Sequence, residues 1–312
     1  MMSSFFITRL LLKDWQRSGT LQFRQFYVRR VRRLFPAMLL MVLAVTAFTW
    51  WVLGHRTDRM LNVVGTLFYF ANWLRALEIP HEIYLGHTWS LSIEEQFYLL
   101  WPLLLYGGLR WGPAKGERRL WFWLPVLSAV ILGVFAWRLY LVMQGASVPR
   151  LYNGTDMRVD SLAMGALIAL VFDRPTYQRA MRRLSHPAIT WALLLLVLAG
   201  GLTVQYFDRG WYAWQQSAFV LISAALITSL LNAQESWGLR WVLQNRVSLY
   251  LGSICYGMYL WHYPIIEFCR TVYGLGVTQV FLISAPLTFA LASLSYHWVE
   301  LPALNRSIGS AR

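Results

Sequence analysis

Continuous apolar runs of about 20 residues recur along the whole chain, and they restrict it to very few folds. The runs do not alternate between apolar and polar residues, so they predict helices rather than strands. A helix of about 20 apolar residues spans the hydrocarbon core of a bilayer. Inside that core every backbone N–H and C=O needs a partner within the protein, which only helices and closed barrels provide. We therefore expect an all-α fold, a polytopic membrane helical bundle.

The composition supports a membrane protein and argues against a nucleic-acid-binding protein. Of the 312 residues, 57% are hydrophobic and only 13% are charged, whereas soluble domains carry about 25% charged residues. The net charge of +14 is explained by cytoplasmic loops, in which helical membrane proteins collect Lys and Arg. We expect membrane lipids as partners and no nucleic acid.

Eight apolar runs are candidates for membrane crossings, and a ninth run, at 60–77, is ambiguous. Pro302 follows the last run, and we expect that helix to end near Glu300 because the residue before a proline disfavours helix. The expected crossings are residues 36–54, 87–108, 120–142, 158–173, 187–204, 211–231, 247–267 and 277–298.

Loop charge decides how to interpret the ninth run. Residues 1–34 contain eight basic residues. Four more lie in the loop 109–119, among them Lys115, and another four lie in the loop 174–186. The positive-inside rule puts all three segments in the cytoplasm, so an even number of crossings must separate residues 34 and 109. We therefore expect 60–77 to be a re-entrant or interfacial helix at the outer side. Residues 1–312 should form a single membrane domain without a soluble domain.

The two cysteines predict neither a disulfide nor a metal site. Cys255 and Cys269 lie fourteen residues apart on one apolar run, which corresponds to about 21 Å of helix. This separation is too large for a disulfide bond. Because no other residues show metal-ligand spacing either, we expect no metal and no bound cofactor.

Two carboxylates, Glu94 and Glu95, lie inside the expected crossing at 87–108. Glu94 shares a helix face with Tyr98 and Trp101, and Glu95 points about 100° away around the axis. An ionised carboxylate facing lipid costs several kcal/mol, so Glu94 should face the bundle interior or a wet cavity. Either Glu94 belongs to a functional site, or it pairs with an arginine that holds helices together.

A basic cluster precedes the first expected crossing. Arg30 and Arg33 are three residues apart and share a helix face, and Pro36 suits the first turn of a helix. Arginine binds phosphate bidentately, so this pair could hold a phosphorylated donor at the cytoplasmic mouth. The alternative is that positive charge simply anchors the helix at the cytoplasmic surface.

Arg158 and Asp160 open the short run at the outer side. Because residues two apart do not face each other on a helix, we expect each to find its partner on another helix. They belong either to a functional site or to an interface between helices.

His262 lies toward the outer end of its expected crossing, with Tyr259 one turn earlier and Pro264 just after it. A histidine at membrane depth is a candidate for proton handling. Equally, it can be a hydrogen-bonded packing residue beside a proline kink.

Five stretches resemble, in their order along the chain, the motifs of acyltransferase family three, which comprises bacterial integral-membrane O-acyltransferases. Their common order, from residue 3 to about residue 305, carries the resemblance. The stretches are FYVRRVRRLFPAMLL, HTWSLSIEEQFYLLWPLLL, DMRVDSLAMGALIAL, SICYGMYLWHYPII and SYHWVELPALN.

The resemblance implies an enzyme of the bacterial inner membrane that moves an acyl group, usually acetyl, from cytoplasmic acyl-CoA to a hydroxyl. The acceptor would be a surface or exported glycan, such as lipopolysaccharide, peptidoglycan or an exopolysaccharide, or a small molecule. Arg30 and Arg33 would serve the acyl-CoA end, and Glu94 would be catalytic by orienting or activating a hydroxyl or an imidazole. The remaining candidates have supporting or acceptor-side roles: His87, Trp89, Ser90, Glu95, Tyr98, Arg158, Asp160, Tyr259 and His262.

The sequence departs from the family at its start. Members of the family begin with a helix that carries an essential histidine, whereas this sequence starts at SSFFITRLLL, which resembles the tail of the second helix. We therefore expect the usual catalytic histidine to be absent from this chain. Two alternatives to a working acyltransferase stay open: a truncated, catalytically dead remnant, and a membrane transporter or exporter of glycan-like substrates.

Overall fold

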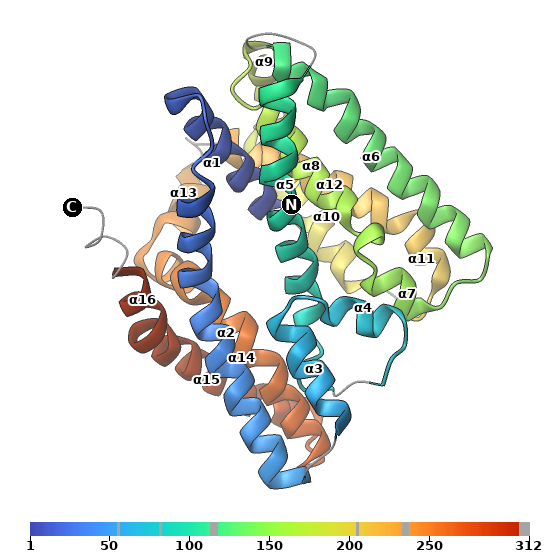
Figure 1. Ribbon diagram of the computed structural model, residues 1–312, viewed down its shortest axis with the longest axis vertical. Coiled ribbons are helices and arrows are strands. Elements are labelled where there is room, and N and C mark those ends of the chain that lie inside the picture. The colour runs from blue at the N-terminus through green and yellow to red at the C-terminus, as the bar shows by residue number, and fades with distance from the viewer. Residues whose placement is uncertain (55–56, 81–82, 113–117, 204–205, 233–236, 306–312) are drawn as a thin grey trace. The chain divides into compact units, whose positions relative to one another are not determined.

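A computed structural model describes residues 1–54, 57–80, 83–112, 118–203, 206–232 and 237–305 (Figure 1). Within these ranges every regular element is helical and no strand occurs, which confirms the prediction of an all-α fold. Lys115 lies outside the described residues. The chain folds as two compact units, each assembled from segments that are distant in the sequence. The first unit comprises residues 1–21, 75–78 and 93–240, and the second comprises residues 22–74, 79–92 and the part from residue 241 onward.

In the first unit, α8 packs against both α1 and α6, and α12 packs against α10. Gly165 of α8 makes the close approach of α1 possible, because a Cβ atom there would lie 2.2 Å from Ser4 Oγ. The helices of this unit are α1 (Met2–Ser18), most of α5 (Thr88–Trp111), α6 (Arg118–Met143), α7 (Val148–Asn153), the 3-10 turn η1 (Thr155–Met157), α8 (Val159–Val171), α9 (Pro175–Leu184), α10 (Pro187–Leu202), α11 (Arg209–Ala213) and α12 (Gln215–Asn232).

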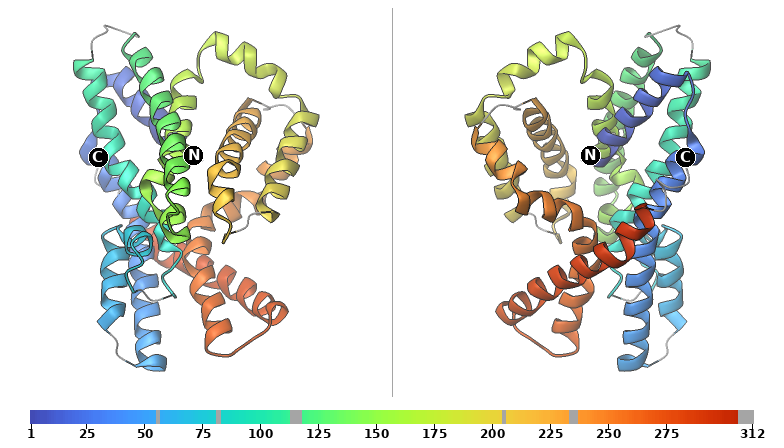
Figure 2. Two further views of the ribbon diagram at one scale, coloured as in Figure 1. Left: turned by 90° about the vertical axis from the view of Figure 1, so that its right-hand side faces the viewer. Right: turned by 90° about the vertical axis from the view of Figure 1, so that its left-hand side faces the viewer.

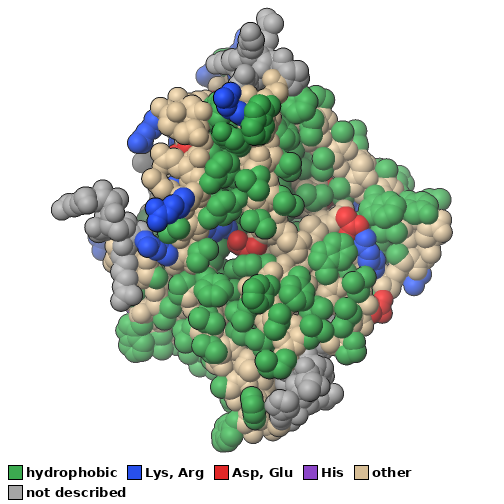
Figure 3. All heavy atoms as spheres, viewed as in Figure 1, with side chains coloured by type: hydrophobic (Ala, Val, Ile, Leu, Met, Phe, Trp, Pro, Cys, Tyr) green, Lys and Arg blue, Asp and Glu red, His purple; other side chains and the backbone are tan. Residues whose placement is uncertain are grey.

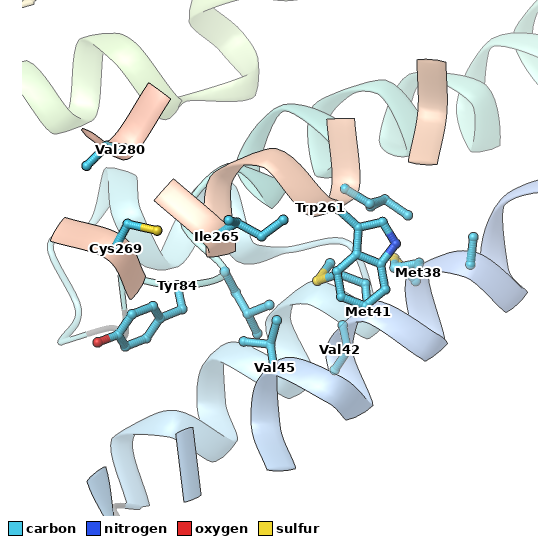
Figure 4. Close-up of a cluster of buried hydrophobic side chains, with 12 residues drawn as sticks. Met38, Met41, Val42, Val45, Tyr84, Trp261, Ile265, Cys269 and Val280 are labelled. Atoms are coloured by element: carbon cyan, nitrogen blue, oxygen red, sulfur yellow. The ribbon is translucent and has the colours of Figure 1, made fainter. Parts of the chain in front are cut away.

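In the second unit, α14 and α15 form a helical hairpin, and α14 also packs against α2 (Figure 2). Met38 and Met41 of α2 face Trp261 and Ile265 of α14 in a buried apolar core (Figure 4). This unit contains α2 (Phe23–Leu53), α3 (Thr57–Leu67), the start of α4 (Ala71–Ala76), the first turn of α5, α14 (Arg246–Thr271), α15 (Val277–Ser295), the π-helical turn η2 (Tyr296–Glu300) and α16 (Leu301–Asn305), and α13 (Trp237–Gln244) precedes α14.

Four described helices are long and apolar enough to cross a membrane: Phe23–Val52, Trp121–Met143, Gln215–Asn232 and Val277–Asn305. The bent pair Pro175–Arg182 and Pro187–Leu202 makes five if it counts as one span. Seven of the eight predicted runs fall mainly within one helix each, whereas the run 211–231 is divided between α11 and α12 at Trp214. In addition, α8 and α10 are short, and α5 and α14 carry charged residues. Eight crossings therefore stay a prediction.

Exposed apolar side chains cover much of the face shown in Figure 3. Leu43 of α2 and Leu132 of α6, for example, are 59% and 66% exposed. Both lie in helices that are long enough to cross a membrane. Such surfaces suit a lipid environment, where apolar side chains can face outward without cost.

Two predictions about prolines are wrong. Pro36 does not open a helix: α2 begins at Phe23, and Pro36 lies inside it. Pro302 does not end the last helix either, because α16 continues from Leu301 after the π-helical turn η2. Within η2 the N–H of Leu301 bonds to the carbonyl of Tyr296, and such a widened turn accommodates a proline that lacks an N–H of its own.

The ambiguous run at 60–77 forms two short helices instead of one. The helix α3 has eleven residues and α4 has six, and Tyr69 between them adopts a positive φ of 58°. Each helix is too short to span a bilayer by itself. The re-entrant or interfacial location of this segment stays a prediction.

Candidate active site

The two arginines predicted for the acyl-CoA end lie in the first half of α2. Arg30 is half-buried and Arg33 is exposed. The carboxylate of Glu300, in η2, attracts Arg33 electrostatically and accepts a hydrogen bond from Ser295 Oγ at 3.3 Å. This end of α2 therefore has a basic surface, and the Glu300 carboxylate neutralises part of its positive charge.

Five residues of the second unit form what we call the imidazole cluster: His87, Ser90, Tyr259, His262 and Tyr263. The ring centroid of His87 lies 5.6 Å from that of His262 and 5.1 Å from that of Tyr263. The Tyr259 hydroxyl donates to the backbone carbonyl of His87 at 2.6 Å, and its oxygen lies 2.5 Å from Ser90 Oγ. The cluster joins the start of α5 to α14 and brings together four residues that the sequence singled out.

Threonine hydroxyls hold the segment that carries His87. Thr88 Oγ1 donates to the carbonyl of Leu85 at 2.8 Å, and it lies 3.0 Å from Thr66 Oγ1 of α3. Because a hydroxyl has one hydrogen, Thr66 must be the donor to Thr88. In this turn His87 is only 6% exposed. Trp89 follows in the first turn of α5 and is half-buried.

Glu94 lies in the first unit and faces α1. Its Oε2 accepts a hydrogen bond from the Tyr98 hydroxyl at 2.9 Å, and its Oε1 accepts one from Ser3 Oγ at 3.2 Å. On the same face of α5, Trp101 Nε1 donates to Thr8 Oγ1 at 2.9 Å. The predicted shared face is confirmed. The hydrogen bonds that Glu94 accepts from the described residues come from hydroxyls, so the alternative of an arginine–glutamate pair finds no support there.

Asp160 finds its partner on another helix, as predicted. Its Oδ2 lies 2.8 Å from Arg138 Nη2 of α6, and 0% of the Arg138 side chain and 4% of the Asp160 side chain are exposed. The same guanidinium donates to the carbonyl of Met157 at 2.9 Å and to Ser217 Oγ at 2.6 Å. This buried ion pair therefore ties α6, α8 and α12 together.

Arg158 is held by the segment just before it. Its Nε donates to the carbonyl of Tyr152 at 3.0 Å, and its guanidinium carbon lies 4.8 Å from the centroid of the Tyr152 ring. Tyr152 belongs to the short α7, so this contact agrees with the prediction that Arg158 reaches another helix. Glu95 is half-buried on α5, and the neighbouring Gln96 accepts a hydrogen bond from Thr155 Oγ1 at 2.6 Å.

A second ion pair, Arg150–Asp156, lies outside the expected crossings. The guanidinium of Arg150 binds both carboxylate oxygens, at 2.8 and 2.5 Å, and Trp137 Nε1 donates at 2.8 Å. Burial by itself raises the pKa of Asp156, but these hydrogen bonds and the arginine charge outweigh it and hold the pKa below its usual value. This pair fixes the segment between α7 and α8.

Sequence reasoning missed Arg138, although its signal was available. Arg138 is a single charge within the apolar run at 120–142. A charged side chain at membrane depth usually pairs with an opposite charge or with backbone carbonyls. It also missed Ser3 as a partner of Glu94 and Tyr263 as a neighbour of His87. No pattern in the sequence marks those two, because each contact joins segments that are distant along the chain.

The described residues contain no group of three or more His, Cys, Asp or Glu side chains placed to hold a metal ion. Cys255 and Cys269 are free, as predicted. An open cavity of about 310 Å³ lies among α10, α11 and α12, where Leu196 and Trp211 line it. None of the predicted site residues contributes to its lining.

Comparison with known proteins identifies the lineage. Residues 1–297 match a family model described as an acyltransferase domain. The chain is 30% identical to the peptidoglycan O-acetyltransferase OatA of Listeria monocytogenes, over 96% of this chain and 49% of that protein. It is 33% identical to the putative peptidoglycan O-acetyltransferase YrhL of Bacillus subtilis, over 99% of this chain and 50% of that protein.

A putative O-acetyltransferase of Staphylococcus aureus is 27% identical, over 98% of this chain and 52% of its own length. The chain thus spans about half the length of these relatives. No solved structure matches it. Because the family model covers nearly the whole chain, the chain belongs to the acyltransferase 3 family.

Proposed function

We propose that this chain carries the membrane step of an O-acetyltransferase, which moves an acetyl group from acyl-CoA to a hydroxyl of a cell-wall glycan. The observation that carries the proposal is the likeness to two proteins named for peptidoglycan O-acetylation, over almost the full length of this chain. Peptidoglycan is accordingly the acceptor we expect, rather than lipopolysaccharide or an exopolysaccharide. The protein would reside in the bacterial plasma membrane.

The donor would bind at the basic end of α2. Coenzyme A carries several phosphates, and arginine is well suited to binding phosphate. Arg33 is exposed and lies near the carboxylate of Glu300. The local charge is still positive, because Arg29, Arg30 and Arg32 lie nearby on the same helix. The residues nearest the phosphates would be Arg30 and Arg33.

Glu94 would help to hold the acceptor hydroxyl. Its carboxylate already accepts hydrogen bonds from two hydroxyls, those of Ser3 and Tyr98. A carboxylate can accept about four such bonds, so a substrate hydroxyl could join them. We expect Glu94→Gln, which keeps the shape but loses the charge, to lower turnover by about tenfold or more.

Transfer of labelled acetyl from acetyl-CoA to soluble peptidoglycan fragments tests this function in the full native protein. The variant Arg30→Gln/Arg33→Gln should weaken acetyl-CoA binding. The matched control Arg29→Gln/Arg32→Gln removes the same charge at the same spacing on another side of the helix and should bind nearly as well as wild type. A wild-type protein that neither binds acetyl-CoA nor transfers acetyl would refute the proposal, as would equal losses in the two variants.

The chain would cross the membrane eight times, with α5, α8, α10 and α14 crossing in addition to the four long apolar helices. This arrangement puts the basic loops in the cytoplasm, on the side where acyl-CoA is made. Single cysteines introduced at loops, in a variant lacking Cys255 and Cys269, can be labelled from either side with a charged maleimide. Labelling of a cysteine between α3 and α4 from the cytoplasm would contradict an outer location of 60–77.

A further inference from the structure

The open cavity of about 310 Å³ in the first unit lies among α10, α11 and α12. Its volume is at the lower end of the range for small-molecule sites, which is about 300–1,000 Å³. Along α10 its lining extends from Leu196 to Thr203, which corresponds to about 10 Å of helix. The cavity is therefore long enough to hold a segment of an extended chain.

One end of the cavity is apolar and opens on a surface that suits lipid. Leu196, Phe219 and Ile222 line this end, and Leu196 is 54% exposed. Beside them, Leu195 of α10 and Leu221 of α12 are 64% and 59% exposed. The helix α12 is long and apolar enough to cross a membrane, and α10 belongs to the bent pair that can count as one span. Because an empty cavity forfeits packing contacts and water binds poorly among apolar side chains, an acyl chain of the surrounding lipid fits this end.

The polar residues of the lining gather at the opposite end, because α10 and α12 are antiparallel. Near the start of α10, Thr190 Oγ1 lies 2.6 Å from Ser229 Oγ, which belongs to the last turn of α12. Near the end of α10, a Cβ atom added at Gly200 would lie 3.3 Å from the Phe219 ring, which belongs to the second turn of α12. The end of α10 therefore lies beside the start of α12. The polar residues that line this end are Thr203, Asp208 and Gln215.

This polar end offers hydrogen-bond acceptors and a negative charge. The Asp208 carboxylate is exposed, and its Oδ1 accepts a hydrogen bond from the N–H of Gly210 at 2.8 Å. A carboxylate can accept about four such bonds, so it can bind further donors. The Thr203 hydroxyl donates its hydrogen to the carbonyl of Gly200 at 3.0 Å, which leaves its oxygen as an acceptor.

The remaining polar group of the lining is the Gln215 amide. In the orientation that its surroundings favour, its nitrogen donates to the carbonyls of Gly210 and Trp211, 2.7 and 3.1 Å away, and its oxygen is left as an acceptor. None of the described residues that line the cavity is basic. The ligand group that suits this end is therefore a cationic hydrogen-bond donor.

We propose that this cavity binds a zwitterionic phospholipid with a primary amine, phosphatidylethanolamine. One acyl chain occupies the apolar end, and the ammonium group, which has three N–H donors, binds the Asp208 carboxylate and the Thr203 hydroxyl. Phosphatidylglycerol binds less tightly, because its headgroup is anionic and has no ammonium group. In the eight-crossing arrangement Asp208 lies at the outer end of α10, so the lipid comes from the outer leaflet. This binding is independent of acetyl transfer.

Native mass spectrometry of the full protein in detergent, titrated with each lipid, measures the two Kd values. We expect phosphatidylethanolamine to bind wild type about fivefold more tightly or better, because hydrogen bonds to charged groups are the stronger ones. Asp208→Asn should abolish that difference, while asparagine still caps α11 through the bond to Gly210. Asp173→Asn is the matched control: Asp173 is an exposed carboxylate of the same unit that does not line the cavity, and its loss should leave the difference unchanged.

A second pair of variants tests the apolar end. Ala218 lines the cavity, so Ala218→Phe places a ring in the space of the acyl chain. We expect both lipids to bind it about tenfold more weakly or worse, since a filled site has no room for the chain. Ala199→Phe adds the same ring at an exposed position of α10 outside the lining and should bind both lipids as wild type does.

Photochemical cross-linking needs no variant and covers the case in which Asp208→Asn or Ala218→Phe does not fold. Phosphatidylethanolamine that carries a diazirine in one acyl chain is photolysed with the wild-type protein, and mass spectrometry locates the label. The label should lie on the cavity-lining residues of α10 and α12, and an excess of unlabelled phosphatidylethanolamine should prevent the reaction.

Three results would overturn the proposal: equal affinity of wild type for the two lipids, an unchanged difference in Asp208→Asn, or labels that spread over the exposed apolar helices and resist competition. The last result would mean that only bulk bilayer lipid contacts this surface. None of these measurements involves acetyl-CoA, so their failure leaves the proposed function standing. A protein that binds phosphatidylethanolamine as expected but neither binds acetyl-CoA nor transfers acetyl would refute the proposed function alone.

Discussion

The two polar clusters of this protein are built in opposite ways. In the first unit, Arg138 and Asp160 are both charged, almost fully buried and joined at 2.8 Å, with further guanidinium bonds to Met157 and Ser217. In the second unit, the imidazole cluster is held by hydroxyl and backbone groups, and His262 Nδ1 contacts the carbonyls of Met258 and Tyr259. The first arrangement holds helices together through an ion pair, whereas the second does so through hydroxyl and backbone hydrogen bonds around two histidines.

The comparison indicates where each unit obtains its stability. A buried ion pair is costly to disrupt, because the surviving charge is left without a partner in a medium that solvates it poorly. Neutral hydrogen bonds are each worth only about 1 kcal/mol. The first unit should therefore depend strongly on its ion pair, and the second should depend more on the packing of its helices than on its polar groups.

Removing one member of the buried ion pair should have the largest effect. We expect Asp160→Leu to destabilise the protein by about 3–5 kcal/mol, because Arg138 would remain buried without its counter-charge. The double variant Arg138→Met/Asp160→Leu should recover most of that loss, since two apolar residues pack without a desolvation cost. Thermal unfolding in detergent micelles measures both.

An exposed ion pair supplies the control for this experiment. Arg9 Nη2 and Asp173 Oδ1 are 2.9 Å apart, close to the 2.8 Å of the buried pair, but their side chains are 23% and 72% exposed. Asp173→Asn should cost less than about 1 kcal/mol. If Asp160→Leu costs no more than Asp173→Asn, the buried pair does not stabilise the first unit, and the contrast between the two units is lost.

The second unit should be most sensitive where its helices approach closely. A Cβ atom at Gly257 of α14 would lie 3.2 Å from the Cα atom of Ala292 in α15. We expect Gly257→Val to destabilise the protein by about 1–3 kcal/mol through overpacking. Gly252→Val is the matched control, because Gly252 lies on the same helix with no atom within 4 Å of the added Cβ. Equal melting temperatures for the two variants would refute this account of the α14–α15 interface.

Much of the fold could be predicted from the sequence, because apolar runs and helical spacing are local properties. The expected crossings are mostly helical, although the run 211–231 is interrupted at Trp214. The spacing of Glu94 and Tyr98 placed them on one face, where their side chains form a hydrogen bond. The predictions that failed concern where helices begin and end outside the apolar runs. The helix α2 extends into FRQFYVRR, since arginine and glutamine are good helix formers, and hydropathy says nothing about where such a helix begins.

The candidate site was less accessible to sequence reasoning. His87 and His262 were each recognised as unusual, but their ring contact joins segments 175 residues apart, and no periodicity relates such positions. The break at Tyr69 depends on one left-handed residue that composition does not signal. The π-helical turn before Pro302 depends likewise on local hydrogen bonding rather than on residue type.

Removing the Tyr259 hydroxyl should sharpen the contrast between stability and activity. Tyr259→Phe loses the bonds to Ser90 and to the carbonyl of His87, which should lower stability by about 1 kcal/mol. If the hydroxyl helps to position the imidazole cluster, kcat for acetyl transfer should fall roughly tenfold. Tyr250→Phe, on the same helix, should change neither quantity. A variant that loses more than about 3 kcal/mol would show that this cluster, too, holds its unit together.

The smallest effect should come from Asp156, whose ion pair with Arg150 is neither deeply buried nor fully exposed. The pKa of Asp156 lies below its usual value of 3.8. Its contribution to stability is therefore complete above the pKa of the unfolded chain and is lost as the pH falls through the lowered pKa of the folded protein. We expect wild type to lose stability on acidification below about pH 4, and Asp156→Asn to lose less over that range.

Solvent screening keeps this effect below those expected for Asp160→Leu, Gly257→Val and Tyr259→Phe, because the Asp156 side chain is 33% exposed. Melting temperatures of wild type and Asp156→Asn, compared across the acidic range, measure it. If the melting temperatures of the two proteins fall equally with pH, carboxylates other than Asp156 cause the loss of stability in acid. A loss as large as that of Asp160→Leu would instead mean that partial exposure does not weaken an ion pair in this protein, and burial would no longer explain the difference between its charged and neutral clusters.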